Sequence, residues 1–292
     1  MNPLGDAERD TVGTVAEGYE AFEAGHWQLA GELLSDAAGR VAEGAGELWF
    51  DAALAYKFAG NWPRAYATGR TAIGFVPRGR GEPAFWNLGI AATMLREWAV
   101  ARDCWAGFGL DLPPGDGPIH EDLGPVCIRL GDVGEVVWAR RLCPARARVI
   151  SVPFDTSRRF GEVLVHDGAP TGERELEGRT VPVFDEIAIF EASSTVTLSV
   201  LVTAATPDDL AQLQTGFARR GLGVEVLAAR LDLCACCSGG RVLQQAGGFA
   251  GEQRLLLGAG MQQARDLLDA WAEQQPGGRA WANLHPAVSS SG

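Results

Sequence analysis

Three tryptophans recur at nearly constant spacing in the first third of the chain. Trp27, Trp62 and Trp98 lie 35 and then 36 residues apart, each within a similar short segment. A period of this length is typical of helical hairpins that stack on one another, because one hairpin alone cannot bury its apolar face. The spacing therefore predicts an array of about three helix pairs that ends near Pro114.

The sizes of the residues between these tryptophans support the same prediction. Small residues such as Ala53 and Gly89 would let antiparallel helices approach closely, whereas Tyr56 would fill a gap between hairpins. Pro77 and Pro113 are expected to end the second helix of a pair, because a proline ring cannot continue a helix.

This pattern resembles the tetratricopeptide repeat family. The matching positions are Trp49, Ala52, Ala53, Tyr56, Gly60, Ala65, Ala72 and Pro77 in the second unit, Phe85, Leu88, Gly89, Ala92, Ala101, Phe108 and Pro113 in the third, and Gly18, Ala30 and Ala37 in the first. The first unit matches least, which is common for a terminal repeat that acts as a cap. The resemblance implies that residues 1–114 form a helical repeat domain that binds another protein.

The resemblance also implies a concave groove lined by the first helix of each pair. The family's inward-facing positions fall on Tyr19, Phe22, Phe50, Asp51, Leu54, Lys57, Phe58, Trp86, Asn87, Ile90 and Met94. Rigid aromatic side chains are favoured at protein-binding surfaces, and a helix or an extended segment of a partner would fit. Some family members clamp a terminal carboxylate, but only Lys57 and Asn87 could serve here. The alternative is that the chain's own second half covers the groove.

The second half of the chain changes in pattern. Turn-forming residues predict a linker over 115–130, and apolar alternation near 149–154, 163–165 and 181–189 predicts short strands, with a turn at residues 166–170. Residues 196–202 then read as a strand, Thr206 and Pro207 as the start of a helix to about Arg220, and residues 224–227 as a returning strand.

This β-α-β unit predicts a ferredoxin-like element, which an amphipathic helix with Met261, Ala264, Leu267, Leu268 and Trp271 on one face would close. The fold class is therefore α+β: the repeat domain, the linker, an α+β domain over 131–285 and a flexible tail over 286–292. Stretches at 134–141, 159–163, 165–170 and 181–186 resemble a little-characterised group of bacterial tetratricopeptide proteins, an architecture that includes immunity partners of secreted toxins and adaptors.

Three closely spaced cysteines are the best candidates for a metal site. Thiolates at Cys234, Cys236 and Cys237 could hold zinc or copper(I), with Cys143 or His166 completing the shell. A structural zinc site usually needs two such pairs, so the prediction is that they are small core residues. A metal or redox site stays the alternative, and no cofactor is predicted.

No catalytic template predicts an enzyme. The sequence lacks the usual zinc-protease, phosphate-loop and serine-hydrolase motifs. The glycines at 258 and 260 resemble a dinucleotide-binding turn, but too little chain follows for a Rossmann unit. Two groups are candidates for acid–base catalysis: His166 with Asp167 in a predicted hairpin turn, and His120 beside Glu121 and Asp122 in the linker. We interpret both groups as structural.

The charge of the chain restricts its partners. A formal net charge of -12 repels phosphate backbones and argues against nucleic acid. We find no signal-peptide pattern and no long apolar stretch, which predicts a cytoplasmic protein without a membrane partner. Together with this charge, the resemblance to tetratricopeptide proteins implies a bacterial immunity or adaptor protein for a basic toxin or effector. The alternative is an enzyme or ligand-binding domain in residues 131–285 that the repeats target.

Overall fold

The structure is a computed structural model that describes residues 6–131, 134–176, 178–227 and 251–287. The chain divides into two compact units, residues 1–120 and residues 121–292. The fold is mixed, with a helical first unit and a strand-rich second unit. No helix in the described ranges is long and apolar enough to cross a membrane.

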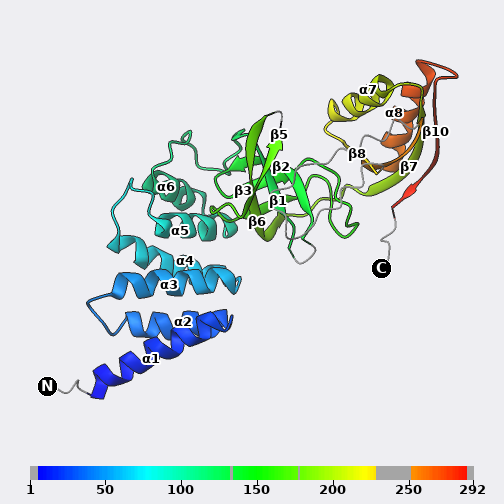
Figure 1. The fold of residues 1–292 in the computed structure, drawn as a ribbon. Coiled ribbons are helices and arrows are strands. Elements are labelled where there is room, and N and C mark those ends of the chain that lie inside the picture. The colour runs from blue at the N-terminus through cyan, green and yellow to red at the C-terminus, as the bar shows by residue number, and fades with distance from the viewer. Residues whose placement is uncertain (1–5, 132–133, 177, 228–250, 288–292) are drawn as a thin grey trace. The chain divides into compact units, whose positions relative to one another are not determined.

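The described part of the first unit consists of three helix pairs stacked in chain order (Figure 1). The pairs are α1 (Asp6–Glu23) with α2 (Trp27–Ala38), α3 (Ala45–Phe58) with α4 (Trp62–Ala72), and α5 (Pro83–Met94) with α6 (Trp98–Phe108). The three tryptophans that set the period are the first residues of α2, α4 and α6. Each helix contacts the next along the chain, and α3 also contacts α5.

Glycines allow the close packing within and between these pairs. A Cβ atom on Gly89 of α5 would lie 2.5 Å from the Trp105 ring of α6, and one on Gly31 of α2 would lie 2.8 Å from the Tyr56 ring of α3. Both distances are shorter than van der Waals contact, so only glycine fits at either position.

The second helices end before the prolines that were expected to end them. The 3-10 turn η1 (Ile73–Phe75) extends α4 almost to Pro77. In contrast, α6 ends at Gly109, whose φ of 112° is left-handed, four residues before Pro113. Gly109 and not Pro113 ends α6, because a residue with a side chain rarely adopts that conformation.

The second unit begins with a six-stranded sheet that closes on itself. Its strands are β1 (Pro125–Arg129), β2 (Val136–Cys143), β3 (Arg146–Val149), β4 (Val163–His166), β5 (Gly172–Leu176) and β6 (Arg179–Glu191). The order is β1-β2-β3-β4-β6-β5, and β1 also pairs in parallel with β6. Because β4 and β5 both pair with β6, the turn at residues 166–170 does not form the predicted hairpin.

The strand β1 lies inside the segment that the sequence assigned to the linker. Val126, Cys127 and Ile128 are all buried. The sequence of β1 therefore lacks the alternation of buried apolar and exposed polar residues that marks a strand with one face in solvent. A strand buried on both faces gives no period-two signal, which explains the wrong linker boundary.

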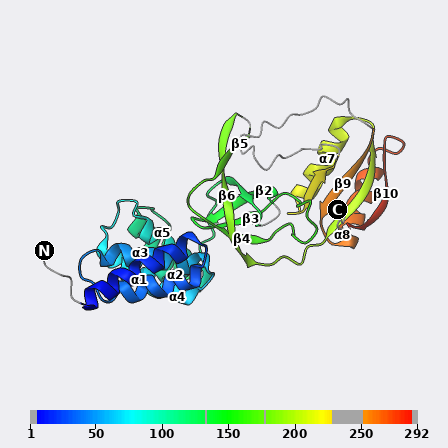
Figure 2. The ribbon, with the colours of Figure 1, turned by 60° about the horizontal axis from the view of Figure 1, so that its bottom comes forward.

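The second part of this unit is a four-stranded antiparallel sheet with two helices (Figure 2). Its elements are β7 (Thr197–Ala204), α7 (Pro207–Ala218), β8 (Gly223–Val226), β9 (Glu252–Gly258), α8 (Met261–Glu273) and β10 (Arg279–Pro286). The order is β10-β7-β9-β8, so β9 lies between β7 and β8. Gly258 is the last residue of β9 and Gly260 follows it; this strand is antiparallel to both neighbours, unlike the parallel strands of a Rossmann unit.

Both helices pack on one face of this sheet. Side chains of α7 and α8 share a core with alternate residues of β7 and β9: Leu198, Val200, Val202, Leu213, Phe217, Leu255, Leu257, Ala264, Leu268 and Trp271. Thr206 and Asp209 form a capping box at the start of α7. The buried Asp209 carboxylate also accepts from Arg279 Nη2 at 2.7 Å, which ties β10 to α7.

Candidate functional site

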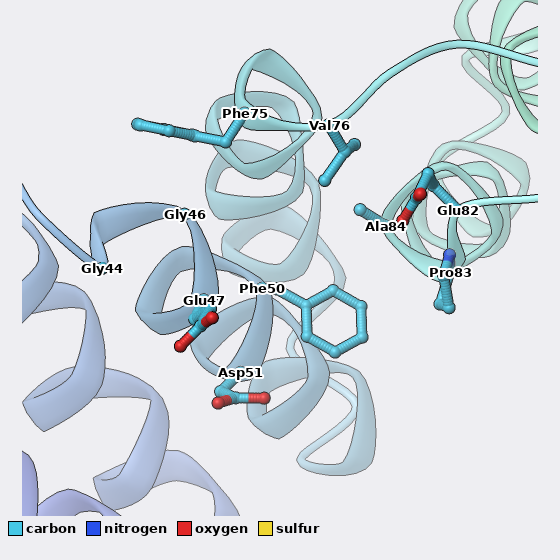
Figure 3. Close-up of a pocket in the computed structure, with 10 residues that line it drawn as sticks. All are labelled: Gly44, Gly46, Glu47, Phe50, Asp51, Phe75, Val76, Glu82, Pro83 and Ala84. Atoms are coloured by element: carbon cyan, nitrogen blue, oxygen red, sulfur yellow. The ribbon is translucent and has the colours of Figure 1, made fainter. Parts of the chain in front are cut away.

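A cavity of about 510 Å³ opens between α3 and α5 (Figure 3). Residues from α3 and its N-terminal turn, from the turn after α4 and from the start of α5 line it: Gly44, Gly46, Glu47, Phe50, Asp51, Phe75, Val76, Glu82, Pro83 and Ala84. Its volume falls within the range typical of ligand sites in proteins. All of its walls belong to the first unit.

Local sequence explains how this cavity forms. A Cβ atom on Gly46 would lie 2.7 Å from Phe75 Cβ, so this glycine lets the turn after α4 lie directly against α3. Gly44 begins α3 with a left-handed φ of 76°. Pro83 is the first residue of α5, where a proline is well tolerated because the first amide of a helix has no partner within it.

The cavity wall is acidic. Glu47 and Asp51 lie one helical turn apart on α3, and Glu82 lies across the cavity from them at the start of α5, with the Phe50 ring in between (Figure 3). The lining contains neither lysine nor arginine. Burial raises the pKa of the Asp51 carboxyl, and the Glu47 charge raises it further, whereas a hydrogen bond from Tyr19 opposes the change. Glu47 and Asp51 thus repel each other, and a cation beside them would relieve the repulsion.

Apolar side chains form the rest of the wall. Phe50 and Phe75 contribute aromatic rings, and Val76 and Pro83 contribute aliphatic surface. Phe75 is 55% exposed although it is a large apolar residue. A wall with both carboxylates and aromatic rings suits the aliphatic stem and charged end of an arginine or lysine side chain.

Some of the predicted groove residues meet at this cavity or next to it. Phe50 and Asp51 line it. The Tyr19 hydroxyl of α1 donates to Asp51 Oδ2 at 2.7 Å. Further along these helices, Phe22 and Phe58 both pack against Trp27, with ring centroids 5.0 Å apart in each pair. Phe22 of α1 and Phe58 of α3 thus share one aromatic cluster with Trp27 of α2, and Phe58 is 46% exposed.

The structure contradicts other predicted groove residues. Ile90 is fully buried and Lys57 is 3% exposed, so neither offers its side chain to a partner. Lys57 Nζ instead donates to Asn87 Oδ1 at 2.9 Å. Most residues of α5 are buried. The repeat pattern alone therefore does not reveal which face of α5 is accessible to a partner.

The remaining predicted residues do not line the cavity. Trp86 is half-buried and packs edge to face on Trp105 and Phe108 of α6, with ring centroids 5.2 and 4.9 Å away. It is therefore part of the packing between α5 and α6. Leu54 and Met94 are half-buried and lie outside the cavity wall.

The sequence analysis missed Glu47, Phe75 and Glu82. Glu47 precedes Asp51 by four residues, so helical periodicity alone would have placed the two carboxylates on one face. No comparable signal exists for Phe75 or Glu82, which reach the cavity through the loop that joins α4 to α5.

The candidate acid–base pairs are not arranged for catalysis. His166 is fully buried and stacks on Phe184, and burial lowers its pKa to about 4. Its Nδ1 atom lies 2.7 Å from the backbone carbonyl of Asp167, whereas the Asp167 carboxylate accepts from the Gly168 amide. In the linker region His120 is exposed, and the carboxylate of Asp122 pairs with Arg140.

The predicted cysteine cluster, Cys234, Cys236 and Cys237, lies outside the described residues, as do residues 288–292 of the predicted tail. Within the described residues, no three His, Cys, Asp or Glu side chains are gathered as metal ligands, and this includes the cavity carboxylates. Comparisons of the chain with protein-family models, with curated proteins and with solved structures found no match.

Proposed function

We propose that the first unit is a tetratricopeptide-type array that binds a partner protein and receives one of its basic side chains in the cavity between α3 and α5. The observation that carries the proposal is the wall of the cavity, where three carboxylates and five apolar side chains occur without a lysine or arginine. The helix pairs and their period of 35 and 36 residues support the tetratricopeptide interpretation.

The charge of the whole chain supports a basic partner. A net charge of -12 accelerates the approach of a positively charged protein and disfavours acidic competitors. A partner of this kind fits an immunity or adaptor protein that acts on a basic toxin or effector in the bacterial cytoplasm. The aromatic cluster of Phe22, Trp27 and Phe58 would supply a second contact along the same helices.

For the second unit, we propose that the part from β7 to β10 is a ferredoxin-like domain. Its elements follow the sequence β-α-β-β-α-β, and its strands have the order β10-β7-β9-β8. The core shared by α7, α8 and one sheet face supports this assignment.

Selection from a library of random displayed peptides tests the binding function. The library is panned on the full chain and on two double variants, Glu47→Gln/Asp51→Asn at the cavity and Asp266→Asn/Glu273→Gln on the exposed side of α8. Both variants remove two negative charges, so general charge effects are matched. We expect the wild type and the α8 variant to enrich peptides with an arginine or lysine beside apolar residues, and the cavity variant to lose them. Equal enrichment by all three proteins, or none by the wild type, contradicts the proposal.

A further inference from the structure

The face of the four-stranded sheet opposite α7 and α8 carries polar side chains that the proposed function does not use. Successive residues of a strand point to opposite faces. Leu198, Val200 and Val202 of β7 lie in the core beneath the helices, so Ser199 and Leu201 lie on the other face.

Strand pairing places basic residues next to these two positions. Leu201 pairs with Arg254 of β9 on one side, and Ser199 pairs with His285 of β10 on the other. With Asn283 and Leu284, they line a cavity of about 390 Å³. Three adjacent strands of one sheet therefore bring two basic side chains, a hydroxyl and an amide around one space.

The edge strand is irregular at this cavity. The pairing of β10 with β7 shifts in register between Ala282 and His285, and Asn283 there has a left-handed φ of 56°. Few residues other than glycine adopt this conformation, although asparagine does so more readily than most. A bulge of this kind redirects side chains and is frequent next to functional sites. Here it places both Asn283 and Leu284 at the cavity.

The polar atoms around the cavity favour an anion. Its lining contains Arg254 and His285 but neither aspartate nor glutamate, in a chain with a net charge of -12. In the part of the chain that the structure describes, no carboxylate pairs with the Arg254 guanidinium. His285 Nδ1 donates to the Pro286 carbonyl at 2.9 Å, because a carbonyl can only accept. Nε2 in this tautomer is an acceptor, so the Arg254 guanidinium is the group of this cavity that pairs with an anion.

We propose that this cavity binds a small organic anion, a carboxylate or phosphate group on a short apolar stem. The Arg254 guanidinium pairs with the anionic group, as its planar fork suits both kinds of oxyanion. Ser199 and Asn283 add hydrogen bonds, while Leu201 contacts the stem. This site is separate from the cavity between α3 and α5 and does not depend on the function proposed for it.

Nuclear magnetic resonance titration of the full chain tests the proposal with three probes: hexanoate, butyl phosphate and the uncharged hexanamide. We expect at least one charged probe to shift the amide signals of Ser199, Asn283 and His285, and hexanamide to leave them unchanged. The stronger of the two charged probes identifies the preferred anionic group. Equal shifts with hexanamide, or no shift at these residues with either anion, overturn the proposal.

Two arginine variants then separate the site from general charge effects. Arg254→Gln removes the proposed cation, whereas Arg265→Gln removes the same charge from the exposed side of α8. Loss of one charge-assisted hydrogen-bonding group predicts about a tenfold weaker affinity for Arg254→Gln, and an unchanged affinity for Arg265→Gln. Both arginines are exposed, so we expect both variants to stay folded and to give well-dispersed amide spectra. Equal affinities of the two variants would assign the shifts to nonspecific binding and refute the site.

Discussion

Tyr19 of α1 donates a hydrogen bond to Asp51 of α3 over 2.7 Å, and so joins two helices that belong to different pairs. The bond fixes the Asp51 carboxylate next to Glu47 at the wall of the acidic cavity. Burial and the Glu47 charge raise the pKa of Asp51, so the folded protein holds a carboxylate that would be more stable in water. The Asp51 carboxylate would therefore gain stability from pairing with a cationic side chain of a partner.

The Tyr19 hydroxyl is therefore expected to contribute to stability. Tyr19→Phe removes one hydrogen bond and should lower the free energy of unfolding by about 1 kcal/mol, measured by urea denaturation. Tyr66→Phe is the control, because the Tyr66 hydroxyl makes no hydrogen bond to the described residues. In an Asp51→Ala background, Tyr19→Phe should have almost no further effect. A similar loss in both backgrounds would show that the bond does not stabilise the fold.

Substitution of Gly89 tests the close packing of α5 on α6. A methyl group there would lie 2.5 Å from the Trp105 ring, so Gly89→Ala should lower the free energy of unfolding by about 2 kcal/mol through overpacking. Gly13→Ala on α1 meets no atom within 4 Å and should raise it by about 1 kcal/mol through helix propensity. Thermal and urea unfolding of both variants give the comparison. Stabilisation by both substitutions would contradict the packing described for α5 and α6.

Glu225 of β8 predicts a dependence of stability on pH. Burial raises the pKa of its carboxyl from 4.5 to about 7, and the Glu135 charge adds to this, although the Val152 amide opposes it. The folded state binds the proton more tightly than the unfolded state. The stabilisation is therefore complete below pH 4.5 and is lost as the pH rises through 7.

Relative to Glu225→Gln, the wild type should thus lose up to about 3 kcal/mol of stability over that range. The free energy of unfolding of both proteins, measured at several pH values, provides the check. Glu252→Gln changes an exposed carboxyl of the same sheet and should follow the wild type. Parallel curves for the wild type and Glu225→Gln would show that Glu225 titrates normally in the folded protein.

Local pattern was sufficient to predict the parts of the fold that depend on nearby residues. The tryptophan period predicted three helix pairs, and in the structure each of these tryptophans is the first residue of the second helix of a pair. The cap at Thr206 and the apolar face of α8 were likewise readable, since capping and amphipathicity involve residues within about four positions.

Features that depend on distant contacts were not readable. The parallel pairing of Cys127 with Val183 closes the first sheet, but the sequence of neither strand indicates that the other is its partner. Ile90 occupies an inward-facing position of the repeat pattern, yet tertiary packing buries it fully. Phe75 reaches the cavity only because Gly46 lets the turn after α4 approach α3. Each of these outcomes is decided by tertiary packing.

The most direct test of the central claim is a double-mutant cycle on the binding of a peptide selected by the wild type. Its dissociation constant is measured for the wild type and Asp51→Asn, with the basic residue of the peptide either arginine or the uncharged isostere citrulline. If the arginine lies among the cavity carboxylates, the two changes are coupled by about 1 kcal/mol or more. Additive effects of the two changes would show that the basic side chain binds elsewhere and would contradict the account.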